Sequence, residues 1–436
     1  MKRRMMALGL ALTLALSLLA GCGGDKSKPA TTEPAASTPA PAKLVEIDYW
    51  NVFTGPDGKG MQNLVEQFNK EYEGKIKVNV QSLPGGEYYD KIVTAVASGQ
   101  APEVGIMHLD NVAKFASKGI LQPLDDDIKA MNIQGSNYLP AAWKGGQFEG
   151  KQYSIPLDFH PLALYYNIDL LEKAGFKAPP TNPDEFVKMA KAATKGDTWG
   201  FMVPIGWPTQ MMFASGLAQN GGTLYSADGK TPTYNSAEGV KAMQFLKDLI
   251  YTHKVSPENV PVDGGVTAFR QGKLLFTIDG IWMMQGFKDQ AGLKFGVAPV
   301  HTLFGTSKKA VWGGSHQFVL YKMKKNDAEK RKAALTFVDW IGKKSVEWAK
   351  WGQIPAHNGA RGSNEFKALT EQATLAQQTD SATFVEAKDN PWAAQGWDPV
   401  VEQMNLILTN KLEVKAGLDK AVENGKKALE AAKAGN

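Results

Sequence analysis

Cysteine is almost absent from this chain, because Cys22 is the only one among its 436 residues. A single thiol cannot form an internal disulfide, and it cannot supply the set of thiolates that a structural zinc site needs. The six histidines stand at positions 108, 160, 253, 301, 316 and 357, and no His-Glu-x-x-His motif occurs. The acidic run 125–127 lacks the glycine and the final glutamate of a calcium loop, so we interpret it as the start of a helix. The sequence therefore predicts no metal site.

The sequence also lacks the features of nucleic-acid-binding proteins, serine hydrolases and nucleotide-binding proteins. The formal net charge is only +5, and there is no basic tract of the kind that follows a phosphate backbone, so we expect no nucleic-acid partner. Neither a Gly-x-Ser-x-Gly motif nor a phosphate-binding Gly-x-x-x-x-Gly-Lys-Ser/Thr loop occurs. We therefore expect no cofactor and assign no catalytic residue. Sequence alone leaves open a pair of carboxylates that meet only in space, as in a glycoside hydrolase.

The one long apolar run lies at the N-terminus and has the features of an export signal. Three basic residues at positions 2–4 precede the apolar stretch 5–20, which is too short and too early for a transmembrane span. It ends in "LLAGC", an arrangement that resembles the bacterial lipobox, in which the cysteine is acylated and the chain is cut just before it. We predict that residues 1–22 are a lipoprotein signal peptide and that Cys22 anchors the protein to the outer face of the cell membrane. An ordinary signal peptide with a chance cysteine is the alternative.

Residues 23–43 follow as a segment rich in Pro, Ala, Thr and Ser, without any aromatic residue. Such a segment cannot bury enough apolar surface to fold, so it predicts a flexible linker behind the anchor. About 390 residues remain, which is enough for two globular units at roughly 100–200 residues per domain.

Apolar periodicity predicts an α/β fold for this remainder. Between residues 44 and 119, three strand-like runs (44–51, 75–83 and 103–107) are each followed by a helical pattern (61–72, 87–99 and 110–119). This order is typical of a parallel sheet covered by helices on both faces. The pattern changes near residues 150–160, where a long extended segment enters a helix. Further helices are expected from 182 and at 208–219, 237–251, 265–271, 327–352 and beyond 398, and further strands at 198–204, 273–280, 295–300 and 313–323.

Three stretches resemble, in order, the family 1 extracellular solute-binding proteins of bacterial ABC importers, the maltose-binding-protein-like group. "GQAPEVGIMHLDNVAKFASKGILQPLDD" is similar to the family's strand, ligand loop and helix before a Pro-Leu-Asp turn. "GKQYSIPLDFHPLALYYNIDLLEKAGFKAPPTNPDEF" resembles its hinge strand, which runs into a helix and a Pro-Pro-Thr turn. "FRQGKLLFTIDGIWMM" resembles its helix, strand and Gly-x-Trp. The three stretches occur in the same order as in the family and follow a lipobox. Together they indicate the family over nearly all of residues 44–436.

The resemblance implies a two-lobed periplasmic-binding-protein-like fold of type II, in which crossing strands join two α/β lobes around a ligand cleft. Each expected lobe is discontinuous: residues 44–157 with about 315–352 form lobe 1, and residues 158–314 with about 353–436 form lobe 2. The resemblance also implies a monomeric receptor, not an enzyme, which captures a carbohydrate, expected to be an oligosaccharide, and delivers it to the transmembrane subunits of an ABC permease. The alternatives are a receptor for glycerol-phosphate esters, which the small number of arginines disfavours, and a secreted glycosidase.

Aromatic side chains are the first candidates for ligand contact. Sugars present polar rims and C–H faces, so their sites combine aromatic plates with a few polar groups. We expect six tryptophans to be such plates, because they follow strands, lie near a crossing, or resemble in position the stacking residues of maltodextrin binders. Burial in the core is the alternative for each of them. They are Trp50, Trp207, Trp282, Trp312, Trp392 and Trp397. Three others stand at helical spacing with apolar partners and are expected in the core: Trp340, Trp348 and Trp351.

Polar residues complete the predicted site. Asp110 matches an aspartate that the maltodextrin binders aim at sugar hydroxyls, although a helix N-cap would also explain it. Asp158 and His160 lie on one face of the hinge strand in an otherwise apolar run, where we favour ligand contact over a mutual or backbone hydrogen bond. His316 and Arg361 are weaker candidates.

This sequence departs from the maltodextrin binders at three of the matching positions. Asn111 stands where those proteins carry an arginine, Met107 where they carry a tryptophan, and His160 where they carry a glutamate. These departures put maltose in doubt and favour a different oligosaccharide.

Overall fold

The computed structural model describes residues 44–383 and 390–434. The predicted signal peptide, the lipid anchor at Cys22 and the linker 23–43 lie outside these described residues. Among the helices in the described ranges, none is both long and apolar enough to cross a membrane.

The first third of the described chain alternates strands and helices, as its apolar pattern predicts. Its strands are β1 (Val45–Asn51), β2 (Ile76–Ser82), β3 (Val104–His108), β4 (Gln147–Phe148), β5 (Lys151–Gln152) and β6 (Ile155–Pro156). Its helices are α1 (Pro56–Glu71), α2 (Gly85–Ser98), α3 (Leu109–Ser117), α4 (Asp125–Ala130) and α5 (Pro140–Gly145), with a 3-10 turn η1 (Gly135–Asn137). The acidic run begins α4 as predicted, where carboxylates favour the N-terminal end of the helix dipole.

The middle of the chain begins with the long strand β7. Its strands are β7 (Asp158–Asn167), β8 (Phe276–Gly280), β9 (Phe295–Pro299), β10 (Val311–Gly314) and β11 (His316–Leu320). Its helices are α6 (Ile168–Lys173), α7 (Pro183–Ala193), α8 (Thr209–Gln219), α9 (Ala237–Tyr251), α10 (Gly264–Arg270), η2 (Ile281–Met283) and α11 (Met284–Lys288). The predicted start of α7 is confirmed, because the Asn182 side chain accepts a hydrogen bond from the backbone N–H of Glu185.

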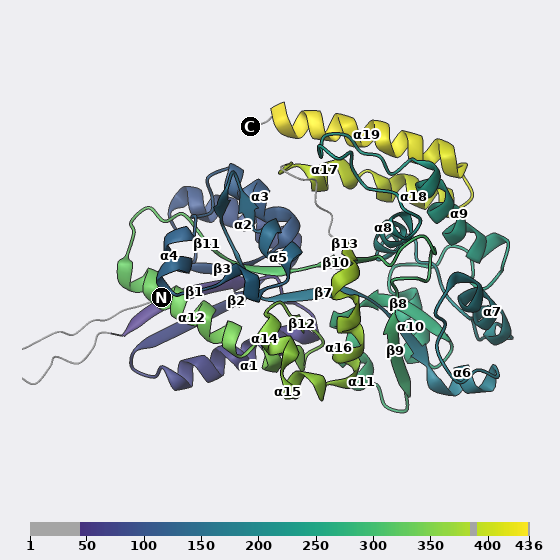
Figure 1. Cartoon of the computed structure of the whole chain (residues 1–436), viewed down its shortest axis with the longest axis horizontal. Coiled ribbons are helices and arrows are strands. Elements are labelled where there is room, and N and C mark those ends of the chain that lie inside the picture. Colours follow the sequence, from purple (N-terminus) through teal and green to yellow (C-terminus); the bar gives the residue numbers. More distant parts are fainter. Residues whose placement is uncertain (1–43, 384–389, 435–436) are drawn as a thin grey trace, which may run out of the picture. The chain divides into compact units, whose positions relative to one another are not determined.

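The last third is mostly helical. Its elements are α12 (Ala328–Lys343), α13 (Ser345–Ala349), β12 (Ile354–Pro355), α14 (Asn358–Gly362), α15 (Asn364–Lys367), α16 (Thr370–Leu375), η3 (Ala376–Ser381), β13 (Ala382–Thr383), α17 (Ala393–Trp397), α18 (Val400–Leu408) and α19 (Val414–Ala434). The long α19 packs against α9, α17 and α18 (Figure 1). The prediction that Trp340 and Trp348 belong to the core is confirmed, since both are buried, whereas Trp351 is half-buried.

The first sheet has the strand order β2-β1-β3-β11-β6. Strands β1, β2 and β3 are parallel, as predicted, and β11 pairs antiparallel with both β3 and β6. Alternate residues of β3 enter different cores, Ile106 on one face and Met107 on the other. The core around Ile106 is closed by α1 and α12, and the core around Met107 by α2 and α3. Helices therefore cover both faces of this sheet.

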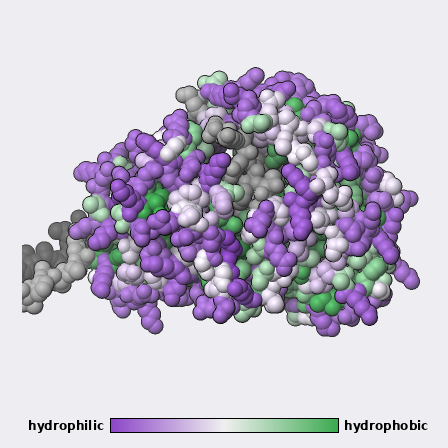
Figure 2. Space-filling model, viewed as in Figure 1, coloured by the Kyte–Doolittle hydropathy of each residue, from purple (hydrophilic) through white to green (hydrophobic). Residues whose placement is uncertain are grey.

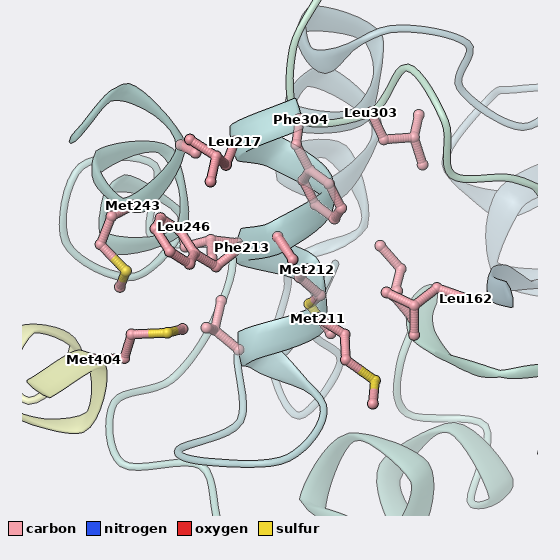
Figure 3. Packing of buried hydrophobic residues seen from close by; sticks show 14 of the residues in the cluster. Leu162, Met211, Met212, Phe213, Leu217, Met243, Leu246, Leu303, Phe304 and Met404 are labelled. Atoms are coloured by element: carbon pink, nitrogen blue, oxygen red, sulfur yellow. The ribbon is translucent and has the colours of Figure 1, made fainter. Parts of the chain in front are cut away.

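The second sheet is built around β7, which pairs with β8, β9, β10 and β12. Its residues also alternate, so that Leu162 and Leu164 enter a large core while Ala163 and Tyr165 enter a smaller one. The large core surrounds α8, whose buried Met212 and Phe213 lie among side chains from neighbouring helices and strands (Figure 3).

The chain passes between the two sheets at Leu157, between β6 and β7, and at Ser315, between β10 and β11. The two crossings lie side by side, since the N–H of Leu157 donates to the carbonyl of His316 at 2.8 Å and the Ser315 hydroxyl donates to the carbonyl of Asp158 at 2.6 Å. A third segment joins them where β12 pairs with the start of β7. Figure 1 shows β7 leaving the region of the first sheet toward β8 and β9. The predicted lobe boundaries themselves stay a prediction.

The strand expected at 198–204 is wrong. This segment makes only isolated bridges, from Trp199 to Leu274 and from Pro204 to Val260. Its alternating pattern reflects burial of Phe201 and Val203 in the large core. Its backbone bonds go to several separate segments, among them the start of β8, and do not form a continuous ladder with any one strand.

Candidate functional site

Three histidines meet at the junction of the two sheets. His108 ends β3 and is paired with His316 at the start of β11, and their ring centroids are 5.1 Å apart. His160, near the start of β7, has its ring centroid 4.2 Å from that of His316 and 6.2 Å from that of His108. The three imidazoles therefore form one group, although they come from three different strands.

The carboxylate of Asp158 holds this group together. Its Oδ1 accepts hydrogen bonds from the backbone N–H of His316 at 3.0 Å and from Nδ1 of His160 at 3.1 Å. Its Oδ2 accepts from Nδ1 of His316 and from the indole Nε1 of Trp348, both at 2.8 Å. Asp158 has no exposed surface, and four hydrogen bonds occupy the acceptor sites of an ionised carboxylate. We call Asp158, His160, His316 and Trp348 the Asp158 cluster.

The hydrogen bonds of the cluster fix the proton positions of His160. Burial by itself raises the pKa of Asp158, but His316 and the hydrogen bonds from both histidines outweigh burial and lower that pKa. An ionised carboxylate only accepts, so Nδ1 of His160 carries a proton. Burial and the nearby His316 lower the pKa of His160 to about 4. His160 is therefore neutral at pH 7, and its Nε2 is an acceptor without a proton.

His108 forms its hydrogen bonds with Tyr89 of α2 and not with Asp158. The Tyr89 hydroxyl accepts a hydrogen bond from the backbone N–H of His108 at 3.0 Å and lies 2.8 Å from its Nδ1. Burial and the other two histidines lower the pKa of His108 well below its usual value, so its ring is neutral at pH 7. The Tyr89 hydroxyl can donate to Nδ1 or accept from it, so this contact is compatible with either tautomer of His108.

A metal ion fits this group less well than the hydrogen bonds do. The donor atoms of Asp158, His160 and His316 lie within 4.8 Å of one another, a spacing that one ion can bridge. A metal would have to displace the protons that both imidazoles donate to Asp158, while Trp348 still occupied one of the oxygens. The donors and acceptors of the carboxylate are already matched, so the arrangement is that of a hydrogen-bond network.

Three of the predicted tryptophans gather beside His160, and we call Trp207, Trp282 and Trp312 the tryptophan group. The ring centroid of Trp282 is 5.9 Å from that of His160, 6.0 Å from that of Trp207 and 6.5 Å from that of Trp312. The Trp312 ring lies 6.2 Å from His160. Trp282 and Trp312 are half-buried, and Trp207 is 39 % exposed. Trp207 is the one tryptophan of the described residues that is classed as exposed. The face of the molecule that Figure 2 shows is mainly hydrophilic.

Two glycines make room for these rings. A Cβ atom on Gly280 would lie 2.0 Å from the Trp282 ring, and one on Gly314 would lie 2.2 Å from Nε2 of His160. Real side chains do not approach this closely, so both rings occupy space that only glycine leaves free.

Helices α3 and α17 contact each other. On α3, Asp110 is exposed and its Oδ1 accepts a hydrogen bond from Asn111 at 2.9 Å. Asp110 is not the N-cap, because α3 begins at Leu109. With its amide oxygen turned toward α3, Gln395 of α17 accepts a hydrogen bond from Lys114 at 2.8 Å. Polar contacts thus involve Asp110 in the first turn of α3 and Lys114 in its last turn.

The other predicted tryptophans lie elsewhere. Lys91 Nζ lies 4.7 Å from the half-buried ring of Trp50. The Trp392 ring is buried, with Lys118 Nζ 5.5 Å from it. The buried Trp397 stacks on Phe213 at 6.0 Å within the large core, as in the core alternative. Within residues 44–383 and 390–434, no ring contact joins these three to the tryptophan group.

Arg361 is also placed outside the group of histidines. It donates hydrogen bonds at 2.7 Å to the carbonyls of Pro355 and Ala356.

Sequence reasoning missed His108 and Tyr89 and rated His316 low. A signal for His108 was present, since it directly follows the predicted strand 103–107, and in the structure it is the last residue of β3 and alternates with the buried Met107. Tyr89 gave no such signal, because a tyrosine on a helical face is usually a core residue. Trp348 was expected in the core and lies there, yet its indole N–H belongs to the site's hydrogen-bond network.

Similar proteins were found among characterised sequences and solved structures. A maltooligosaccharide ABC transporter solute-binding lipoprotein of Streptococcus pneumoniae is 26% identical over 425 residues, which is 94% of each chain. A galactooligosaccharide-binding protein of Bacillus subtilis is 22% identical over 438 residues, 97% of each chain. The GacH receptor of Streptomyces glaucescens, solved unliganded and with acarbose, superimposes with a TM-score of 0.77 at 25% identity, over 89% of this chain and 99% of that one.

The fold is therefore the two-lobed α/β fold of these binding proteins, as the resemblance implied. The profile of one family, described as bacterial extracellular solute-binding protein, matches residues 54–347. Because this match covers more than half of the chain, the chain belongs to the bacterial extracellular solute-binding protein family.

Proposed function

We propose that this protein is the extracellular receptor of an ABC importer, that it captures a carbohydrate between its lobes, and that Cys22 anchors it to the outer face of the membrane. The observation that carries the proposal is the tryptophan group beside His160. Indole faces stack on the C–H faces of sugar rings, while hydroxyls need donors and acceptors such as the imidazoles and Asp110. Relatives named for maltooligosaccharides and galactooligosaccharides support the same ligand class.

Anchoring and delivery rest on the sequence and the relatives. The Leu-Ala-Gly-Cys sequence at 19–22 and the linker 23–43 support a lipid anchor. One relative is named as a lipoprotein of an ABC transporter. Delivery to the transmembrane subunits of a permease follows from that role.

Lobe closure would couple binding to transport. We assign residues 44–157 and about 315–352 to one lobe and the remaining residues from 158 to the other. The support is that the chain crosses between the sheets at Leu157 and Ser315. A ligand that contacts both lobes binds the closed form more tightly, and this difference in affinity drives closure.

A phosphate ester is a weaker candidate ligand. Residues 44–436 contain only three arginines. Arg331 pairs with Asp127, Arg361 bonds to backbone carbonyls, and the Arg270 guanidinium lies 5.8 Å from the Phe287 ring. None of them is beside the tryptophan group, where a phosphate would need such a partner.

Glycoside hydrolysis is also less well supported. A general acid must carry a proton and reach the leaving oxygen. Asp158 is ionised and fully engaged by four donors, so it can do neither. We propose binding without bond cleavage.

The test is a thermal-shift screen of the mature protein against neutral mono- and oligosaccharides, followed by titration of the best ligand with tryptophan fluorescence. A bound ligand raises stability by mass action, and stacking changes indole fluorescence. A sugar covering ~80 Å² of the Trp282 face contributes about 2 kcal/mol, so Trp282→Ala should weaken binding about 30-fold. Trp143→Ala is the control, because Trp143 stacks on Tyr138 outside the site. Absence of any stabilising sugar, or hydrolysis of one, would contradict the proposal.

A further inference from the structure

Within the described residues, the Asp158 cluster leaves the Nε2 atoms of His160 and His316 without a hydrogen-bond partner, and of the two rings His160 is the one beside the tryptophan group. Nδ1 of His160 is bound to Asp158, and within the described chain no hydrogen bond uses its Nε2. The His160 side chain is only 4% exposed, so water does not freely replace the missing partner. An unpartnered polar atom in so buried a ring indicates a ligand group that binds there.

The surroundings of this ring belong to the proposed ligand site. The rings of Trp282 and Trp312 lie 5.9 and 6.2 Å from His160. Gly314 pairs with His160 across the two strands, and Nε2 of His160 occupies the space in which a side chain at position 314 would begin. A ligand stacked on either indole would therefore lie close to the His160 ring.

We propose that His160 is a specificity-determining residue, which accepts a hydrogen bond from a ligand hydroxyl through Nε2 and so selects uncharged sugars over sugars that carry a carboxylate or phosphate at that position. This inference rests on the proposed carbohydrate receptor and names its ligand class. A hydroxyl has a proton to give to Nε2, whereas an ionised carboxylate or phosphate has only lone pairs, which face the lone pair of the imidazole. Repulsion between two acceptors is a form of selection against the wrong ligand.

The other charges near His160 do not reverse this preference. Asp158 is the nearest charged group and is negative, and its partner His316 at most balances it. The closest elements packed around the ring contribute His108, which is neutral, and the two indoles. An anion placed at Nε2 therefore has no cation within the cluster to compensate it.

The first experiment reads the proton positions directly. Nitrogen-15 NMR of histidine side chains in the mature protein at pH 7, assigned with His160→Gln, should show His160 neutral, with the proton on Nδ1 and a bare Nε2. A cationic His160, or one protonated on Nε2, would overturn the inference whether or not any sugar binds.

The second experiment compares matched ligands by titration calorimetry. Galactotriose and tri-galacturonic acid form one pair, and mannotriose and tri-mannuronic acid form another. For each pair that binds, the neutral member should bind at least about tenfold more tightly. In His160→Gln the side-chain amide both accepts and donates, so this ratio should fall toward one. His253→Gln, just after the end of α9, should leave the ratio unchanged.

The outcomes separate the two proposals. Equal or tighter binding of the acidic member by the unmodified protein would overturn the role of His160 but leave a sugar receptor. If no sugar binds although Nε2 of His160 carries no proton, the result counts against the proposed sugar receptor. A role of His160 in selecting sugars would then fall with it.

Discussion

Replacing Asp158 by Asn tests whether the charge of this carboxylate holds the Asp158 cluster together. Asparagine has nearly the same shape but offers one oxygen and one NH2 group. If its oxygen takes the place of Oδ2, the NH2 group faces the backbone N–H of His316. If its oxygen takes the place of Oδ1, the NH2 group faces the indole N–H of Trp348. Either orientation opposes two buried donors and forces one histidine to move its proton from Nδ1 to Nε2.

The expected loss of stability follows from these contacts. One buried donor without an acceptor costs about 1–3 kcal/mol, and the remaining bonds lose the contribution of the charge. We therefore expect Asp158→Asn to lower the free energy of unfolding by about 3–5 kcal/mol. Urea unfolding followed by tryptophan fluorescence measures this change, and histidine NMR should show one imidazole in the switched tautomer.

A double-mutant cycle with Trp348→Phe makes the test specific. In the Trp348→Phe background, the NH2 group of the introduced asparagine can face a phenyl ring instead of a donor. The destabilisation caused by Asp158→Asn should then be smaller by about 1–3 kcal/mol. A loss below about 1 kcal/mol in the parent protein, or an equal loss in both backgrounds, would refute the hydrogen-bond assignment.

Two further substitutions test other parts of the site. Gly280→Ala should displace the Trp282 ring and weaken sugar binding about tenfold or more. Gly342→Ala is the control and should leave the affinity unchanged, because its new Cβ meets nothing within 4 Å. Equal effects of the two substitutions in titration calorimetry would contradict the position of the Trp282 ring against Gly280. Burial raises the pKa of Asp279 to about 7, so the folded state retains a proton that the unfolded state has already lost between pH 4 and 7. Stability should therefore fall as pH rises through that window, by up to about 4 kcal/mol in total. Asp279→Asn should lack this fall, and parallel pH profiles of the two proteins in urea unfolding would show that Asp279 is not the cause.

Local elements were largely predictable from the sequence because their signals are local. Alternation in 44–51 and 103–107 and helical spacing in 61–72 correctly predicted β1, β3 and α1. The segment 198–204 has the same kind of alternation, but it meets Leu274, just before β8, through an isolated bridge and forms no continuous ladder, so its strand prediction was wrong. Pairing partners are a tertiary property that a local pattern does not contain.

The candidate site was predictable only in part, for the same reason. Position after a strand indicated Trp207 and Trp282, whose rings the fold brings together, but it equally indicated Trp50, which has no ring contact with them. The resemblance indicated Trp397, which stacks on Phe213 in the large core. A strand end tells where a side chain lies along the chain. It does not tell whether a neighbour such as Lys91 or Phe213 already covers the ring.

By itself, the sequence determined the α/β pattern and the helix starts. It also indicated the family, through three stretches of residues that resemble its members. Only the tertiary structure decided the chemistry of the junction. His108, Asp158, His316 and Trp348 are up to 240 residues apart in the chain, and their meeting depends on three chain segments that cross between two sheets. The proton positions of His160 follow from that meeting, because a hydrogen-bond network exists only when all its members are in place.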